Sequence, residues 1–315
     1  METPDLPPRP SPERRSAPRV IAPLQTPALS GAGILRFPMQ HAELEEVVRG
    51  SLQEDGAFND LTTLATVVSD RRSRGTLVAR ENGLMCGVPI ALEAFRQLDA
   101  KVSIRVDRED GSRVKAGEAV LFVTGHARAL LSAERVALNY LQRLSGIATI
   151  TARYVEAVRG TNAKILDTRK TTPGWRSLEK YAVRAGGGTN HRMDLSTGVL
   201  IKDNHLAALD GDVARAVSRA REQAPRGIKV EVECDRIDQV SRAVDAGADI
   251  ILLDNMAPAL LSECVSLVAG RAILEASGGV TLATVRAIAE TGVDWISVGA
   301  LTHSAPSLDL GLDFE

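Results

Sequence analysis

The chain has 315 residues, of which 44% are hydrophobic and 25% charged, and its formal net charge is -2. This composition is typical of a globular protein, and the near-neutral charge gives no support to a nucleic-acid partner. The three cysteines lie far apart in sequence, which argues against a disulfide framework or a zinc knuckle. No apolar run reaches the about 20 residues that span a bilayer, and no signal or transit peptide is recognisable. We therefore expect a cytoplasmic protein with no membrane partner.

The amino-terminal part of the chain divides into a tail and a small domain. Nine of the fourteen prolines fall within residues 1–38, so we assign residues 1–35 to an extended or disordered tail. For residues 36–145 we predict an α/β sandwich, since a helical pattern (HAELEEVVRGSLQEDG) precedes three strand patterns (GTLVAR, KVSIRV and EAVLFVTG). A long helical stretch follows, and we expect an interruption near Ser145 and Gly146, where we place the domain boundary.

Residues 146–315 show a different pattern, in which short apolar runs alternate with segments of helical periodicity. Strands that are buried on both faces and alternate with helices predict a parallel sheet. Six such units in about 140 residues favour an open α/β barrel of about six to seven strands. A flat doubly wound sheet is less favoured, because no GxGxxG motif opens a helix after a strand. The six runs are AKILDTRK, GVLIKDN, KVEVEC, DIILLDN, AILEASGG and DWISVGA.

Each predicted barrel strand ends in charged, polar or glycine residues. The carboxyl ends of parallel strands meet at one edge of a sheet, so we expect these residues to form one ligand site. Cations follow the first two strands, carboxylates the next two, and small glycine-rich loops the last two. The residues are Arg169 and Lys170, Lys202 and Asp203, Glu233, Asp254 and Asn255, Ser277 with Gly278 and Gly279, and Gly299 with His303.

A basic segment from Lys164 to His205 contains eight Lys or Arg residues against four Asp or Glu residues. Such a local surplus of positive charge suits a small polyanion, because Arg pairs with carboxylate and phosphate in bidentate fashion. The glycine run 186–188 fits an anion-binding nest or an ordinary helix end equally well. The ASGG motif, which we expect to open a helix, is a better phosphate cradle.

Glu233 and Asp254 are candidates for three roles on adjacent strands. They could hold a divalent cation, accept hydrogen bonds from sugar hydroxyls, or balance a developing positive charge. A purely structural role, neutralising Lys170 and Lys202, also remains open. No histidine spacing matches a zinc site. Together the strand ends predict a ligand with phosphates, at least one carboxylate and a ribose.

Several long motifs in the same order resemble the quinolinate phosphoribosyltransferase family, also called carboxylating nicotinate-nucleotide pyrophosphorylases. The resemblance runs from about Glu43 to the carboxyl terminus. One departure is Asn59, where the family pattern has glycine. The motifs are EDGAFNDLTT, SAERVALNYLQRLSGIAT, DTRKTTPGWRSLEKYAVRAGGGTNHRMDLSTGVLIKDNH, VEVE, ILLDN, EASGGV and ISVGALTHSAPSLDLGLDF.

The resemblance implies a homodimer in which the amino-terminal sandwich of one subunit closes the open barrel of the other. It implies transfer of a phosphoribosyl group from 5-phosphoribosyl-1-pyrophosphate (PRPP) to quinolinate with Mg²⁺. Pyrophosphate and CO₂ are released, and nicotinate mononucleotide is formed for NAD synthesis de novo. Decarboxylation is expected to follow N-glycosylation, because only then is the ring nitrogen cationic.

The resemblance also assigns site residues, position by position. It places Glu233 and Asp254 near the ribose and Mg²⁺, and Arg135 in the partner subunit's site. We expect the catalytic residues to be Lys170, Lys202, Glu233 and Asp254. The residues expected to bind the substrates are Arg135, Thr168, Arg169, Lys170, His191, Arg192 and Lys202. Those expected to bind the 5-phosphate are Ser277, Gly278, Gly279 and Gly299.

Three other functions remain open at this point. A barrel lyase or aldolase could use Lys170 or Lys202 as a Schiff-base amine. A molybdenum-associated paralogue of the transferase would share the fold. A nucleotide or RNA binder is less favoured, because the chain has few of the aromatic residues on which bases stack.

Overall fold

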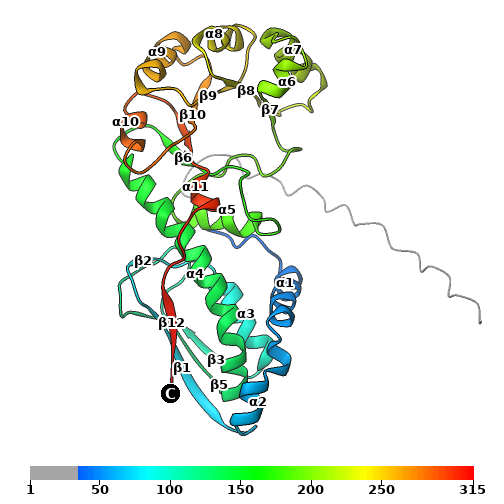
Figure 1. Ribbon diagram of the computed structural model, residues 1–315, viewed down its shortest axis with the longest axis vertical. Helices are drawn as coiled ribbons and strands as arrows, with labels where there is room; N and C mark the ends of the chain where they lie inside the picture. The colour runs from blue at the N-terminus through cyan, green and yellow to red at the C-terminus, as the bar shows by residue number, and fades with distance from the viewer. Residues whose placement is uncertain (1–34) are drawn as a thin grey trace, which may run out of the picture. The chain divides into compact units, whose positions relative to one another are not determined.

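The computed structural model of the protein describes residues 35–315, so all of the predicted tail except Leu35 lies outside the described residues. These residues form two principal sheets joined by one long helix, α4 (Ala127–Ala157) (Figure 1). No helix among them combines the length and apolarity that crossing a bilayer requires.

The amino-terminal sheet contains four antiparallel strands in the order β12-β1-β5-β3. A separate two-stranded ladder joins β2 to β4. Asn59, the departure from the family pattern, ends a short 3-10 turn and has no positive φ. The strands are β1 (Arg72–Ala79), β2 (Gly83–Leu84), β3 (Ser103–Val106), β4 (Arg113–Val114), β5 (Ala119–His126) and β12 (Leu310–Phe314). The helices are α1 (His41–Glu54), η1 (Ala57–Asn59), α2 (Leu61–Thr66) and α3 (Val88–Leu98).

The predicted interruption of the long helix is wrong. Helix α4 runs through Ser145 and Gly146 without a break, and both residues are buried. A Cβ atom at Gly146 would lie 1.9 Å from the carbonyl oxygen of Pro306. Glycine is therefore required there for close packing of another segment and not for a helix end.

The open α/β barrel is confirmed. Its six parallel strands have the order β6-β11-β10-β9-β8-β7, with β6 and β7 at the two edges. Thr189 forms an isolated parallel bridge with Leu166 beside one edge. The strands are β6 (Lys164–Leu166), β7 (Val199–Ile201), β8 (Val230–Cys234), β9 (Ile250–Asp254), β10 (Ile273–Ser277) and β11 (Trp295–Ser297). The helices are α5 (Arg176–Ala185), α6 (Asp203–Ala207), α7 (Val213–Gln223), α8 (Ile237–Asp245), α9 (Pro258–Val268), α10 (Val285–Ala289) and α11 (Ala300–His303).

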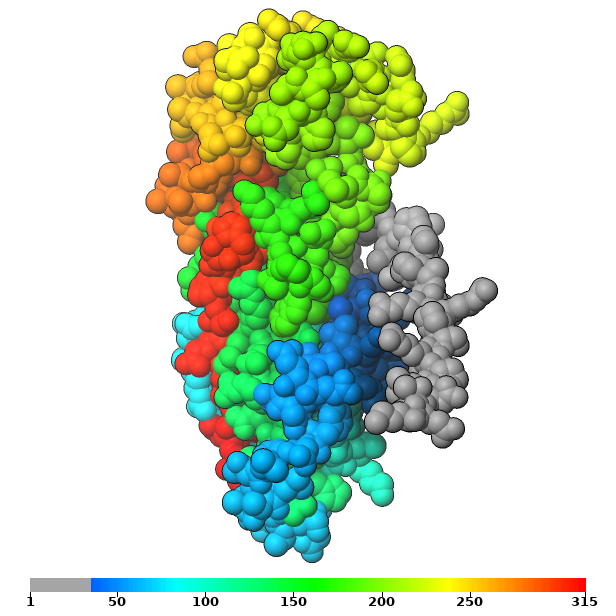
Figure 2. All heavy atoms as spheres, turned by 45° about the vertical axis from the view of Figure 1, so that its right-hand side comes forward, coloured from blue at the N-terminus to red at the C-terminus, as the bar shows by residue number. Residues whose placement is uncertain are grey.

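The last strand, β12, leaves the barrel and pairs with β1 in the amino-terminal sheet. On its way the chain runs along α4, where Leu308 N–H donates to the Gln142 carbonyl at 2.9 Å. The Gln142 side chain in turn donates to the Leu310 carbonyl at 2.8 Å. Figure 2 shows this carboxyl-terminal segment lying against α4. The sequence pattern placed these residues within the barrel domain.

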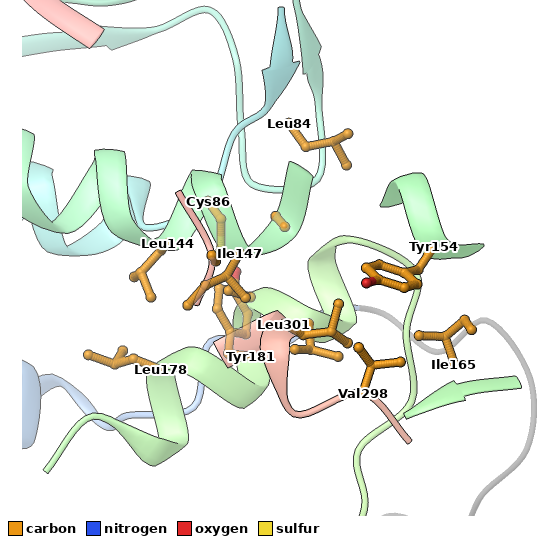
Figure 3. Packing of buried hydrophobic residues seen from close by; sticks show 14 of the residues in the cluster. Leu84, Cys86, Leu144, Ile147, Tyr154, Ile165, Leu178, Tyr181, Val298 and Leu301 are labelled. Atoms are coloured by element: carbon orange, nitrogen blue, oxygen red, sulfur yellow. The ribbon is translucent and has the colours of Figure 1, made fainter. Parts of the chain in front are cut away.

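Helices α4, α5 and α11 share a hydrophobic core (Figure 3). Ile147 of α4, Leu178 of α5 and Leu301 of α11 are each at most 2% exposed. Six consecutive residues of α5, from Leu178 to Val183, are buried, so this helix has no solvent-facing side over its central turns. It is a rigid support for the loops that follow β6 and α5.

Candidate active site

The carboxyl ends of the barrel strands lie at one edge of the sheet, because all five strand pairs are parallel. Lys170 and Lys202 follow β6 and β7 and are exposed, whereas Arg169 and Arg192 are half-buried. We call this edge, with the loops that follow it, the barrel mouth. It is the place where a charged ligand can meet several strands at once.

Two arginines of the mouth lie close enough to oppose each other's charge. Burial and then the charge of Arg169 lower the pKa of the Arg192 guanidinium. Arg192 donates to the Gly198 carbonyl at 2.8 Å. The buried Nε of Arg169 has no hydrogen-bond partner within residues 35–315. A half-buried arginine with an unused donor, beside a second arginine, forms a site that an anion would stabilise.

Lys170 lies beside the loop that follows β11. A Cβ atom at Gly299 would come within 3.2 Å of both Lys170 Cδ and His303 Nε2. The Thr302 hydroxyl donates to the Lys170 carbonyl at 2.7 Å, and Thr168 Oγ1 accepts the Lys170 N–H at 3.0 Å. Glycine at 299 thus leaves room for Lys170 to reach across the mouth.

The ASGG loop has the backbone that a phosphate cradle needs. Gly278 and Gly279 have φ angles of +94° and +58°, and a Cβ atom at Gly278 would lie 2.1 Å from Asn255 Oδ1. In the part of the chain that the structure describes, the N–H groups of Gly278, Gly279 and Gly299 have no protein acceptor. The expected helix directly after this loop is wrong, since α10 begins only at Val285.

The glycine run 186–188 is a helix end and not an anion nest. The N–H groups of Gly186, Gly187 and Gly188 donate to carbonyls of α5 itself. A Cβ atom at Gly186 would lie 2.4 Å from the Ala148 carbonyl oxygen, and one at Gly188 2.7 Å from Val183. These glycines let the end of α5 pack against α4.

Several cations of the basic segment are structural. Lys180 is 1% exposed and pairs with the fully buried Asp167. Burial raises the pKa of Asp167 and lowers that of Lys180, while their mutual attraction works in the opposite direction. Arg176 donates to Thr171 Oγ1 at 3.0 Å, and Arg184 to the Arg36 carbonyl at 3.1 Å. Three of the eight cations in this segment therefore serve the fold.

His191 lies between two buried glutamates that the sequence interpretation missed. Its Nε2 is 3.3 Å from Glu231 Oε2 and 3.4 Å from Glu275 Oε2. Burial lowers the pKa of His191, but hydrogen bonding and charge from the two glutamates outweigh it and raise this pKa to about 10. Glu231 lies two residues before Glu233 on β8, and Glu275 two residues before Ser277 on β10. Residues two apart in a strand share a face, so this spacing could have located both glutamates from the sequence.

These three side chains form a cluster of metal-ligand types, yet a proton on His191 Nε2, which faces the two glutamates, makes the ring a donor there. Its Nδ1 lies 2.7 Å from the Arg192 backbone nitrogen and accepts that N–H in the neutral ring only. When Nδ1 accepts this bond, the single proton of the neutral ring is on Nε2. The charged ring has a proton on Nε2 as well. A protonated nitrogen is not a ligand, so the ring is a hydrogen-bond donor to the glutamates.

Glu233 and Asp254 lie on the adjacent strands β8 and β9, as predicted. Lys202 Nζ contacts the Glu233 carboxylate, and Asn255 Nδ2 donates to Asp254 Oδ2 at 2.8 Å. Carboxylate oxygens suit Mg²⁺, which binds one or two protein carboxylates together with substrate phosphates. Asp254 has the freer carboxylate, whereas Glu233 would first have to release Lys202.

Arg135 is the one predicted site residue that lies away from the mouth. It is exposed on the amino-terminal half of α4, which packs against α3 and β5. It forms no ion pair within residues 35–315.

Comparison with known proteins decides the family. Residues 60–145 match the quinolinate phosphoribosyl transferase N-terminal domain, and residues 147–313 match its C-terminal domain. The chain belongs to the quinolinate phosphoribosyltransferase family. Residues throughout the described part contribute to the match, so the predicted family, pentosyltransferase class and part in NAD synthesis are confirmed.

Individual relatives of this family cover nearly the same length. The probable carboxylating nicotinate-nucleotide pyrophosphorylase of Bacillus subtilis is 43% identical over 275 residues, which are 87% of this chain and 94% of the relative. The Mycobacterium leprae enzyme is 45% identical, with coverage of 85% and 96%. The structure of NadC from Streptococcus pyogenes has a TM-score of 0.84 at 40% identity, covering 88% and 98% of the two chains. The Schiff-base lyase and the molybdenum-associated paralogue are not favoured by these matches.

Proposed function

We propose that the barrel mouth of this quinolinate phosphoribosyltransferase binds quinolinate and PRPP side by side and joins them. The observation that carries the proposal is the buried Nε of Arg169, which has no partner within residues 35–315 and lies beside the cationic Arg192. Quinolinate has two adjacent carboxylates, which two guanidinium groups can bind in bidentate fashion. We expect Thr168, Lys170 and His191 to contact the same substrate.

For PRPP we propose two separate anchor points. The unused N–H groups of Gly278, Gly279 and Gly299, with the Ser277 hydroxyl, bind the 5-phosphate. Lys170 and Lys202 bind and stabilise the pyrophosphate. Holding both substrates in place converts a bimolecular step into a unimolecular one, which lowers the barrier by several kcal/mol.

The proposed reaction has two steps. The ring nitrogen of quinolinate bonds to the anomeric carbon while the bond to pyrophosphate breaks, and that electron pair leaves with pyrophosphate. Glu233 and Asp254 stabilise the oxocarbenium-like charge. The bond between ring carbon 2 and its carboxylate then breaks, CO₂ leaves, and the electron pair stays on carbon 2 beside the cationic nitrogen. A solvent proton completes nicotinate mononucleotide.

Magnesium is part of this proposal. Asp254 would hold Mg²⁺, which would neutralise charge on the leaving group. Lys202 in its present position already neutralises Glu233. Loss of the Asp254 carboxylate should therefore weaken the response to Mg²⁺ more than loss of the Glu233 carboxylate. We expect Asp254→Asn to raise the Mg²⁺ concentration that gives half-maximal rate.

A mass-spectrometric assay tests the proposed reaction. Purified protein with Mg²⁺ and PRPP receives quinolinate and nicotinate in parallel. We expect nicotinate mononucleotide and CO₂ from quinolinate alone, because the second carboxylate is needed for recognition. Product from nicotinate alone would support the assignment of the site but show that quinolinate is not the substrate. No product from either acid would contradict the proposal.

We further propose a homodimer in which Arg135 enters the partner subunit's mouth. Phe58, Leu61 and Leu64, near the same end of the amino-terminal domain, are 51%, 74% and 44% exposed, a cluster that a second copy would cover. Mixing Arg135→Ala with Lys170→Ala subunits tests the shared site. The mixture should regain activity that neither variant has alone, whereas additive inactivity would refute sharing.

We place the protein in the cytoplasm. All three cysteines are free and buried, which suits a reducing compartment. Fractionation of cells that express the tagged chain tests this, and recovery in a membrane or secreted fraction would contradict it.

A further inference from the structure

Helix α5 carries two adjacent buried residues of opposite charge, Glu179 and Lys180. Their exposures are 0% and 1%. Burying a charge is costly unless it is paired and fully hydrogen-bonded. Neighbouring residues of a helix point about 100° apart, so the two side chains reach different parts of the molecule. Each of them ends at a loop of the barrel mouth.

Lys180 holds the backbone of His191 through Asp167. Lys180 Nζ pairs with Asp167 and donates to the His191 carbonyl at 3.0 Å. Asp167 accepts the His191 N–H at 2.8 Å. Asn190 donates to the Lys180 carbonyl at 2.8 Å and also to Asp167. Both polar backbone groups of His191 are thus bound by one buried ion pair.

Glu179 holds the opposite side of the mouth through Arg143 of α4. Arg143 donates to Glu179 at 2.8 Å, to the Ala305 carbonyl at 2.9 Å and to the Thr302 carbonyl. Glu179 also accepts the Thr172 N–H at 3.0 Å and the Thr172 hydroxyl at 2.9 Å. Since the Thr302 hydroxyl binds the Lys170 carbonyl, this network fixes the loop that carries Lys170.

We propose that Glu179 and Lys180 are positioning residues, which set the places of Lys170 and of His191 and Arg192 on the two sides of the mouth. This inference rests on the proposed function of those residues. A buried ion pair is a poor way to gain stability, because well-packed apolar residues do as well. Here the charged groups bind the backbone of the substrate loops, which apolar residues could not do.

The test removes the charges in pairs, so that no buried charge is left alone. In Lys180→Met with Asp167→Leu, both hydrogen bonds to the His191 backbone are lost. We expect kcat/KM for quinolinate to fall about 100-fold, since a displacement near 1 Å can cost that much. Backbone amides of residues 189–193 should exchange with deuterium faster, a readout that needs no enzyme activity.

Tyr181→Phe is the matched control on the same helix. The Tyr181 hydroxyl donates to Asp110 at 2.7 Å, on the side of α5 that faces the amino-terminal domain. This variant also loses a buried polar contact, but it should keep the wild-type kcat/KM and the wild-type exchange of residues 189–193. Equal losses in the double variant and in Tyr181→Phe would overturn the positioning role.

Thr302→Val tests the Glu179 side without touching a charge, and it serves where the double variant does not fold. It removes the donor to the Lys170 carbonyl while keeping the side-chain shape. We expect kcat to fall about tenfold at an unchanged melting temperature, and unchanged kinetics would contradict the proposal. Should wild-type protein make no mononucleotide, the proposed function fails, whereas the exchange data still report on the loops.

Discussion

The barrel mouth and the layer directly beneath it contain the same residue types in opposite settings. In the mouth, Lys170 and Lys202 are exposed, and Arg169 has a buried donor with no partner within residues 35–315. One layer down, Lys180 and Glu179 are buried and fully hydrogen-bonded. Burial and partners, rather than charge, therefore separate the residues that are free to bind a ligand from those that hold the loops.

The largest effect is expected where a lysine is removed from the buried layer. Lys180→Met leaves the Asp167 carboxylate buried without its cation, which should cost about 3–5 kcal/mol of unfolding free energy. The same substitution in the mouth, Lys170→Met, should change stability by about 0.5 kcal/mol or less and remove activity. Urea unfolding of both variants measures the two free energies of unfolding. Equal values would contradict the distinction between the buried layer and the mouth.

A second contrast uses the two ends of the barrel, with Lys202 after β7 and Lys229 before β8. Lys202→Ala, at the mouth, should lower kcat/KM by about 10²–10³-fold, because it removes a cation that stabilises the leaving group. Lys229, which precedes β8 at the opposite end of the barrel, is exposed and pairs with Asp249 at 3.5 Å. Lys229→Ala should keep the wild-type rate. A similar loss in both variants would show a general effect of surface charge.

A smaller effect is expected in the phosphate cradle. Gly278→Ala would place a methyl group 2.1 Å from Asn255 Oδ1 at a φ of +94°, so the loop must shift. We expect the KM for PRPP to rise about tenfold, as one phosphate contact is weakened. At Gly279, a Cβ atom meets nothing within 4 Å. Gly279→Ala should therefore raise this KM less, and the reverse order would count against the cradle.

The smallest effect is expected in thiol labelling of Cys234, which lies on the barrel strand β8. Burial raises the pKa of Cys234 to about 12. Since the raised pKa suppresses the thiolate, very little of this residue is ionised at pH 8. We expect native protein to remain unlabelled by a thiol reagent at pH 8 over an hour, and all three cysteines to react in urea. Rapid labelling of Cys234 in native protein would show that the barrel wall opens.

The sequence predicted the barrel and the strand ends because a parallel sheet imposes both. Periodicity located all six strands, and the alternation Glu231–Glu233 could also have pointed to a buried glutamate. The continuity of α4 was harder to predict, because a glycine such as Gly146 usually weakens a helix. The structure shows that the Pro306 carbonyl packs against this position, so a larger residue would not fit. Non-local packing of this kind leaves no local signal.

Buried ion pairs were missed for the same reason. Nothing in the spacing of Lys180 and Asp167 distinguishes them from Arg169 and Lys170, and all four were read as part of one basic segment. Only the tertiary fold places two of them inside. The catalytic roles of the mouth residues stay predictions, which rest on geometry and on the family resemblance.

The most direct test of this account is the affinity of quinolinate for wild-type protein and for Arg169→Ala, measured by isothermal titration calorimetry. Arg169 is the mouth cation whose buried donor has no partner within residues 35–315. Loss of one charge-assisted bidentate contact should weaken binding at least about tenfold at an unchanged melting temperature. Equal affinities of the two proteins would contradict the claim that the mouth cations bind the dicarboxylate.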